Sequence, residues 1–280
     1  MNGFERKPAV SGLFYPDSSE DLSKTINSLF LDPKFGPGEV PPSNQRRRIF
    51  GIVAPHAGYF YSGAIAANAF YEISSSNFDT VIIIGPNHYG IGSDVAIMKE
   101  GSWITPLGRS DIDANLASEV LNHCEIVEFD SLAHSRDHCI EVQLPFVQFI
   151  NKSAAILPII LKKQDKNTSA GLGQCLGKVI KNRNVMLIAS SDLTHYEPNQ
   201  RAHTKDAELI SSILSMNISE FYSVLESSRV SACGYGAIAA VMFAAKAIGS
   251  TSGKLLRYAT SGDVAGDLAS VVGYSSILFV

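Results

Sequence analysis

The chain has 280 residues, of which 45% are hydrophobic and 18% are charged, and its formal net charge is −4. Such a chain can bury one large α/β core or two small ones, and it carries no basic excess that would attract nucleic acid. It contains no run approaching the ~20 apolar residues of a membrane helix. Its first residues lack the apolar core of a signal peptide, so we expect a cytoplasmic protein without a membrane partner.

Four cysteines are scattered along the chain, at Cys124, Cys139, Cys175 and Cys233, without any Cys-x-x-Cys pair. A disulfide framework is not expected in a chain of this length, and reduced thiols fit a cytoplasmic protein. The sequence therefore predicts four free cysteines.

The first elements are a helix that ends near Phe30 and a loop rich in Pro and Gly over residues 32–48. The run Arg46–Arg48 in this loop could bind an anion, although solvated charge before a strand is the favoured interpretation. Residues 49–54 and 81–84 have the continuous apolar pattern of strands buried on both faces. The Ala-rich segment 62–73 between them has helical spacing, so a strand–helix–strand unit is predicted.

Further strands are predicted over residues 93–99, 125–129, 154–161 and 185–189, with helices over 111–123, 168–181, 206–216, 219–226 and 232–248. Residues 134–150 begin with polar side chains and become an amphipathic helix, in which Pro145 implies a kink or a break. The last segment is typical of two strands around a glycine-rich turn. The pattern predicts one compact α/β domain, over residues 1–280.

Two histidines follow the first two predicted strands in matched positions. His56 stands in APHAG and His88 in GPNHYG, and each is preceded by a proline that ends the strand. Parallel strands of a right-handed unit bring both histidines to the same carboxyl edge of the sheet, where such sheets bind ligands. The pair therefore predicts a metal site.

The segment SSDLTHYEP after the 185–189 strand supplies Asp192 and His195, which should reach the same edge if that strand is also parallel. Asp192 could orient the imidazole and raise its basicity, as a general base requires. The alternative is that Asp192 caps the turn and His195 is exposed. The spacing alone does not decide between them.

Three other residues could support chemistry at this edge. Cys233 precedes an apolar helix whose amino terminus would favour a thiolate, although a small buried hydrophobe is the alternative. His138 and Glu141 in RDHCIEVQLP should share a face of a helix. They could hydrogen-bond to a residue that binds the metal and so orient it, or Glu141 could bind the ion directly. The simpler possibility is that Glu141 lies at the surface.

Taken together, these motifs resemble the Memo family, known in prokaryotes as the AmmeMemoRadiSam system protein B. The resemblance rests on RKPAVSGLFYP, APHAGYFYSG, GPNHYG, HCIEVQLPF, ILPIIL, SSDLTHY, CGYGAI and YATSGDVAGD, in the family's order. It implies a single three-layer α/β domain with a mostly parallel central sheet flanked by helices, similar to the class III extradiol dioxygenases. It also implies a metal at His56, His88 and Cys233, with His195 as the acid–base residue and Asp192 in support.

Those dioxygenases bind non-haem iron with two histidines and a glutamate, whereas the matching third position here is Cys233. A thiolate is softer than a carboxylate and favours copper or zinc more strongly. We therefore expect an iron- or copper-dependent redox protein with a dioxygenase-like site, which could act as an oxidoreductase. A zinc-assisted hydrolase and a non-catalytic binding module are the alternatives.

The partners expected from this resemblance are a small molecule or a peptide in the cleft, together with radical-SAM and AMMECR-type proteins. A homo-oligomer is also compatible with the sequence.

Overall fold

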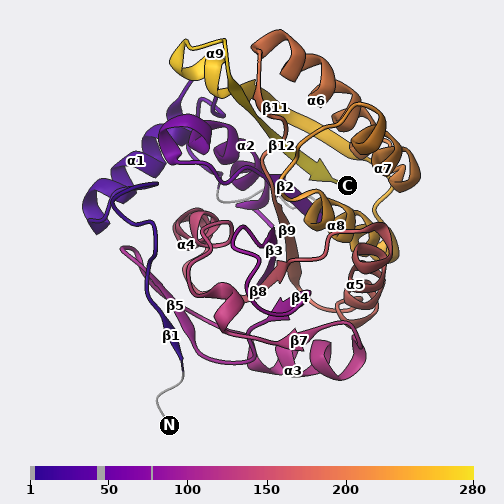
Figure 1. The fold of residues 1–280 in the computed structure, drawn as a ribbon. Coiled ribbons are helices and arrows are strands. Elements are labelled where there is room, and N and C mark those ends of the chain that lie inside the picture. Colours follow the sequence, from indigo (N-terminus) through magenta and orange to yellow (C-terminus); the bar gives the residue numbers. More distant parts are fainter. Residues whose placement is uncertain (1–3, 43–47, 77) are drawn as a thin grey trace.

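The computed structural model describes residues 4–42, 48–76 and 78–280. A central sheet lies between two groups of helices, so the α/β prediction with a helix-flanked sheet is confirmed (Figure 1). The sheet has nine strands in the order β10-β12-β2-β9-β3-β8-β4-β7, with β11 paired to β12. The strands are β2 (Gly51–Ala54), β3 (Thr80–Pro86), β4 (Val95–Ile97), β7 (Glu128–Phe129), β8 (Ala155–Leu161), β9 (Val185–Ser190), β10 (His195–Glu197), β11 (Gly253–Thr260) and β12 (Val271–Phe279).

The four strands at the centre, β2, β9, β3 and β8, run parallel to one another, and antiparallel pairs flank them on both sides. Every residue of β2 and β3 is buried. This burial explains their continuous apolar sequences, because helices cover both faces of a parallel sheet. β9 is inserted between β2 and β3, so the segments that follow these three strands leave the sheet side by side.

Helices α1, α2 and α4 lie on one side of the sheet, and α5 and α8 lie on the other (Figure 1). α6 packs against β11, β12 and α7. A separate three-stranded sheet has the order β1-β5-β6. The bounds are α1 (Ser19–Leu31), α2 (Ala64–Ile73), α3 (Ala114–His123), α4 (Leu144–Ile150), α5 (Lys166–Val179), α6 (Asn199–Leu214), α7 (Ile218–Ser227), α8 (Tyr235–Ile248), α9 (Ser261–Ala265), β1 (Glu5–Arg6), β5 (Ser102–Thr105) and β6 (Gly108–Asp111).

The helix predicted from the pattern of residues 134–150 is much shorter in the structure. Only α4, from Leu144, is α-helical, and a single 3₁₀ turn over Glu141–Gln143 precedes it. Pro145 lies in the first turn of α4, where a missing backbone N–H costs no intrahelical hydrogen bond. His138 therefore lies in a loop, and the expected shared helical face of His138 and Glu141 is wrong.

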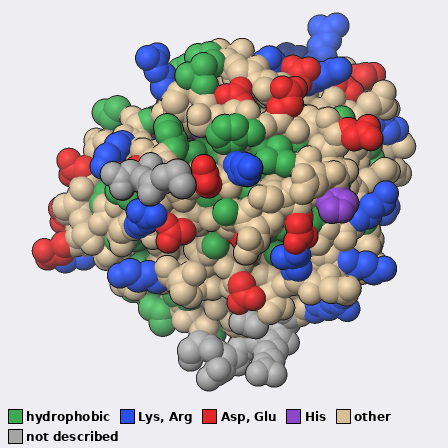
Figure 2. Space-filling model, turned by 90° about the horizontal axis from the view of Figure 1, so that it is seen from below, with side chains coloured by type: hydrophobic (Ala, Val, Ile, Leu, Met, Phe, Trp, Pro, Cys, Tyr) green, Lys and Arg blue, Asp and Glu red, His purple; other side chains and the backbone are tan. Residues whose placement is uncertain are grey.

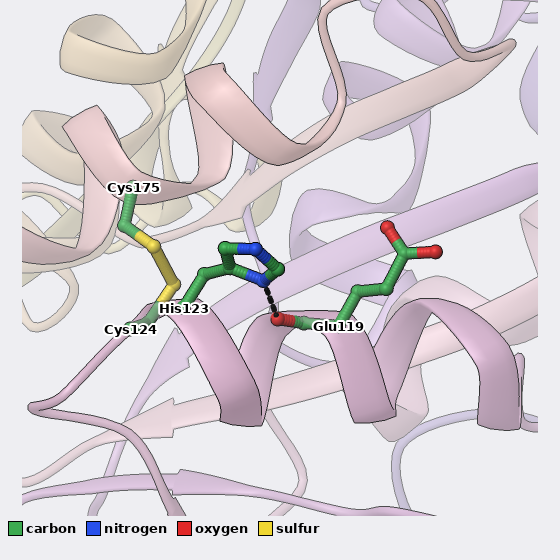
Figure 3. The surroundings of a disulfide bond; sticks show 4 residues. All are labelled: Glu119, His123, Cys124 and Cys175. Atoms are coloured by element: carbon green, nitrogen blue, oxygen red, sulfur yellow. Dashed lines mark hydrogen bonds between the residues drawn. A yellow bond between two sulfur atoms is a disulfide. The ribbon is translucent and has the colours of Figure 1, made fainter.

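Cys124 and Cys175 form a disulfide, with their Cα atoms 5.7 Å apart, so the prediction of four reduced thiols is wrong for these two residues. Figure 3 shows the bond joining the end of α3 to α5, beside His123, whose Nδ1–H donates to the Glu119 carbonyl. The two cysteines are 51 residues apart in sequence, and only the packing of α3 against α5 brings them together. Cys139 and Cys233 are free thiols.

On the face shown in Figure 2, Lys and Arg side chains are interspersed with Asp and Glu, and no single sign dominates. This distribution agrees with the small net charge of −4. Among the described residues, no helix combines the length and the apolar character needed to cross a membrane.

Candidate metal centre

His56 and His88 meet at the carboxyl edge of the parallel strands, together with a third histidine, His138. The ring centroids lie 5.2 Å apart for His56 and His88, 5.4 Å for His56 and His138, and 4.5 Å for His88 and His138. One ligand atom from each of the three rings lies within 4.8 Å of the others. Three imidazoles at this separation could hold a metal ion.

The hydrogen bonds around His56 fix which ring nitrogen carries the proton. The Ser190 hydroxyl donates to the Cys139 carbonyl at 2.6 Å and accepts from Gln143 Nε2 at 2.8 Å. Since this hydroxyl has only one proton, it must also accept from His56 Nδ1, which lies 2.9 Å away. Nδ1 is therefore the protonated nitrogen, and Nε2 presents its lone pair.

His88 is held in the same tautomer by Asp137, which is fully buried. The His88 Nδ1–H donates to one carboxylate oxygen at 2.9 Å, and the backbone N–H of His88 donates to the other at 2.7 Å. The backbone N–H of Cys139 also donates to this carboxylate, at 3.1 Å. A carboxylate behind an imidazole orients the ring and raises its basicity as a ligand, an arrangement common at metal sites.

Cys233 lies beside His56, on the loop before α8. Its Sγ lies 3.1 Å from His56 Nε2, and the backbone N–H of Asp192 donates to the sulfur at 3.3 Å. Gly234 lets this loop approach the end of β9, because a Cβ at that position would lie 2.4 Å from the Ser190 carbonyl oxygen. The structure thus brings the sulfur and the first imidazole together from positions 177 residues apart.

Asp192 and His195 both lie near the centre, but they do not form the expected pair. The carboxylate of Asp192 accepts the backbone N–H of His56 at 2.8 Å. The His195 Nδ1–H lies between two carbonyl oxygens, 2.7 Å from that of Leu193 and 3.0 Å from that of Ser231. Backbone carbonyls therefore orient His195, and its Nε2 is left as the basic nitrogen.

The carboxylate of Glu141 is occupied by the amino-terminal segment. It accepts from Tyr15 Oη at 2.6 Å, from the backbone N–H groups of Ala9 and Val10, and from Arg6. In these contacts the Glu141 carboxylate binds the amino-terminal segment and no imidazole of the centre. Its helical pairing with His138 fails because the helix begins only at Leu144.

Burial keeps the imidazoles of His56 and His138 neutral and able to bind a cation. Burial, together with the neighbouring His88, lowers the pKa of His56 to about 3. Burial and the neighbouring imidazoles also lower the pKa of His138 to about 4. Burial and the nearby Asp192 raise the pKa of Cys233, so a metal that binds the sulfur must displace its proton.

Asp137 has the charge that complements such a centre. Burial by itself would raise the pKa of this carboxyl group, but hydrogen bonds from His88 and from backbone N–H groups lower it below its ordinary value. Burial raises the pKa of Asp192, the other carboxyl group at this edge. The pKa values of the two carboxyl groups therefore shift in opposite directions, and Asp137 is the anion that supports His88.

Sequence reasoning missed three residues that orient the histidines: Asp137, Gln143 and Ser190. Asp137 adjoins His138 in the RDHC motif, and Ser190 ends β9 beside Asp192, so both stand next to predicted site residues. A second group that could hold a metal consists of His88, Asp137 and Cys139. Cys139 is fully buried, and its thiol donates to the Pro86 carbonyl at 3.2 Å.

A cavity of about 800 Å³ reaches Cys233 from the side of α5 and α7. Its walls include the aromatic rings of Tyr222 and Tyr235, and its volume lies in the range of small-molecule sites. The fold and the side chains together define a three-layer α/β protein with a histidine- and cysteine-rich centre beside a cavity.

Comparison with known proteins gives the family. The model of the Memo-like protein family matches residues 6–278. A MEMO1 family protein of Nitrosopumilus maritimus is 49% identical over 276 residues, covering 98% of this chain and 99% of the relative. A MEMO1 family protein of Methanocaldococcus jannaschii is 44% identical over 283 residues, covering 98% of each chain. The chain therefore belongs to the Memo-like family, and the resemblance seen in the sequence motifs is confirmed.

Among solved structures, an uncharacterized protein from Escherichia coli K12 has a similar fold, with a TM-score of 0.55 and 8% sequence identity. The match covers 82% of this chain and 99% of that protein. At this identity the likeness concerns the fold alone.

Proposed function

We propose that this protein is a metal-dependent redox protein with iron or copper at the centre described above. His56 and His88 would bind the ion through Nε2, with Cys233 as a third ligand. The observation that carries the proposal is the hydrogen bonding of both Nδ1 atoms, which leaves the Nε2 lone pair of each ring for an ion, in a cluster whose ligand atoms lie within 4.8 Å of one another. The donor set suits these metals, because imidazole and thiolate are ligands that iron and copper accept.

The bound metal would supply one-electron chemistry, and the chain's own residues would place the substrate and move protons. His195 is suited to acid–base work, because backbone carbonyls hold Nδ1–H and leave Nε2 free to accept a proton. The cavity beside Cys233 would admit a small molecule or a short peptide segment. His138 could replace Cys233 as a ligand, since its ring lies against both other imidazoles.

A zinc-assisted hydrolase is the second candidate, because a set of imidazole and thiolate ligands is also typical of zinc. In that case His195 would take a proton from an attacking water. The two candidates differ in the metal and in the need for O₂, and the same preparation of protein distinguishes them.

The test is elemental analysis and spectroscopy of protein purified without oxygen. We expect about one equivalent of iron or copper, and we expect the double variant His56→Ala/His88→Ala to lose it, since two of the ligands are gone. His123→Ala is the matched control, because His123 is an exposed histidine on α3 and should keep full metal. Full metal in the double variant would refute the site, and zinc in the native protein would favour the hydrolase.

The third ligand is identified by comparing Cys233→Ser with His138→Gln in the same assay. If Cys233 binds the ion, its variant should lose metal or change the thiolate charge-transfer spectrum, while His138→Gln should keep both. The opposite result would assign the third position to His138.

Asp137→Asn should weaken metal binding by roughly 10- to 100-fold, because it removes the carboxylate that orients His88. Asparagine keeps the size of the side chain, so the backbone contacts can remain. The affinity is measured by competition with a chelator, with Asp111→Asn at the surface as the control. An affinity equal to that of the native protein would show that Asp137 is only a structural residue.

A further inference from the structure

A second hollow lies at the opposite edge of the parallel strands, where their amino ends are. It has a volume of about 320 Å³ and is formed by segments that precede β2, β3 and β9. Its apolar lining comes from Ile49, Phe50, Phe78, Ile180, Val185, Met186 and Ile248, and its polar lining from Arg48, Ser76, Lys181, Arg183 and Asn184. The candidate metal residues leave the other ends of the same strands, so the two sites are separate.

Among the described residues, the charged side chains that line this hollow are the cations Arg48, Lys181 and Arg183. Arg183 forms an ion pair with Glu119 at 2.5 Å. The Arg48 guanidinium lies 4.9 Å from the centre of the Phe50 ring. Within the described part of the chain, neither Arg48 nor Lys181 has a carboxylate partner. The lining Asn184 donates to the Asp79 carboxylate at 3.3 Å, so two unpaired cations face one nearby acid and the hollow keeps an excess of positive charge in a protein with a net charge of −4.

One hydroxyl group in the lining has no hydrogen-bond partner among the described residues. The Oγ atom of Ser76 is buried and unpaired, while its backbone N–H donates to the Ile73 carbonyl at 2.9 Å. Buried polar groups are nearly always hydrogen-bonded, and a hydroxyl proton can satisfy an anionic oxygen. The cations and the Ser76 hydroxyl can therefore all bind the same kind of ligand, an oxyanion.

We propose that this hollow binds a small molecule carrying a phosphoryl group. Arginine and lysine together suit the charge of a phosphate monoester, and arginine can donate two parallel hydrogen bonds to it. The apolar lining, which includes Phe50 and Phe78, would accommodate an uncharged body attached to the phosphate. A volume of 320 Å³ is at the lower end for small-molecule sites, which fits a ligand no larger than a nucleoside monophosphate.

Arg48 belongs to the Arg46–Arg48 run that the sequence marked as a possible anion site, and Arg46 and Arg47 lie outside the described residues. Solvated charge was the favoured interpretation of this run. Arg48 lines the same hollow as Lys181 and Ser76, which come from other parts of the chain, and this shared lining favours the anion site.

The proposal is tested by calorimetric titration of the full chain with AMP, inorganic phosphate and adenosine at low ionic strength. We expect AMP to bind, phosphate to bind more weakly, and adenosine to bind least. Arg48→Met/Lys181→Met should weaken AMP binding at least about tenfold, because charge-assisted hydrogen bonds are lost. Ser76→Ala should weaken it several-fold, and higher salt should weaken it further.

The control is Lys254→Met, which removes an exposed cation on β11 without touching the hollow. It should bind AMP like the native protein. Equal affinities for AMP and inorganic phosphate would assign the hollow to the free anion. The proposal would be overturned if neither AMP nor inorganic phosphate gave a binding signal. It would also be overturned if Arg48→Met/Lys181→Met bound AMP as tightly as the native protein.

Discussion

Replacing Glu141 by alanine should lower the free energy of unfolding by about 3–5 kcal/mol, because it leaves the buried Arg6 guanidinium without its counter-charge. The two side chains form an ion pair in which Arg6 is 1% exposed and Glu141 is fully buried. The Glu141 carboxylate also accepts from Tyr15 Oη and from the backbone N–H groups of Ala9 and Val10. All of these donors would lose their acceptor at once.

The same pair connects the amino-terminal segment to the loop that carries His138. Arg6 donates to the carbonyl oxygen of Asp137 at 2.8 Å and to that of His134 at 3.2 Å, and its guanidinium lies 4.3 Å from the centre of the Trp103 ring. A guanidinium that loses its carboxylate here remains desolvated, since the backbone carbonyls carry no full charge. The loss of stability should therefore exceed that of a single neutral hydrogen bond.

Urea unfolding of Glu141→Ala and of the native protein measures this difference. Glu141→Gln should fall between them, because the amide keeps one acceptor for the backbone donors. Glu20→Ala is the control: it breaks the exposed pair of Glu20 with Lys24, and it should change stability little. A loss below about 1 kcal/mol for Glu141→Ala would contradict the importance of the buried pair.

The position of the candidate site was predictable from the sequence because it depends on strand direction. The runs before His56 and His88 are apolar and end at proline. The residues that follow parallel strands all lie at the carboxyl edge of the sheet. Asp192 and His195 were predictable at the same edge for the same reason, since β9 is parallel to its neighbours. The insertion of β9 between β2 and β3 does not change which edge these residues reach.

The contacts within the site were not predictable, because they depend on which donor meets which acceptor. Asp137 adjoins His138 in the sequence but holds His88, which is 49 residues away. Asp192 precedes His195 by three residues, yet it accepts from the backbone of His56. Spacing along the chain indicates neighbours in a helix, and none of these residues lies in a helix: His195 begins β10 and the others lie in loops, where spacing indicates little.

Removing the disulfide should be nearly as costly as breaking the buried ion pair. The bond closes a loop of 51 residues between Cys124 and Cys175, and the chain-entropy model assigns about 4 kcal/mol to a loop of this size. Cys175→Ser should therefore lower the melting temperature by roughly 10 °C. Because α3 and α5 also pack directly, the fold should persist at moderate temperature.

The matched control is chemical reduction of the disulfide in the native protein. A dithiol reductant should lower the melting temperature of the native protein to nearly that of Cys175→Ser, and it should leave the variant unchanged. Thermal unfolding with and without the reductant measures both effects, and thiol titration before and after reduction counts the two sulfurs released. A native protein whose thiol count and melting temperature do not respond to reduction under unfolding conditions would show that Cys124 and Cys175 are free thiols in solution.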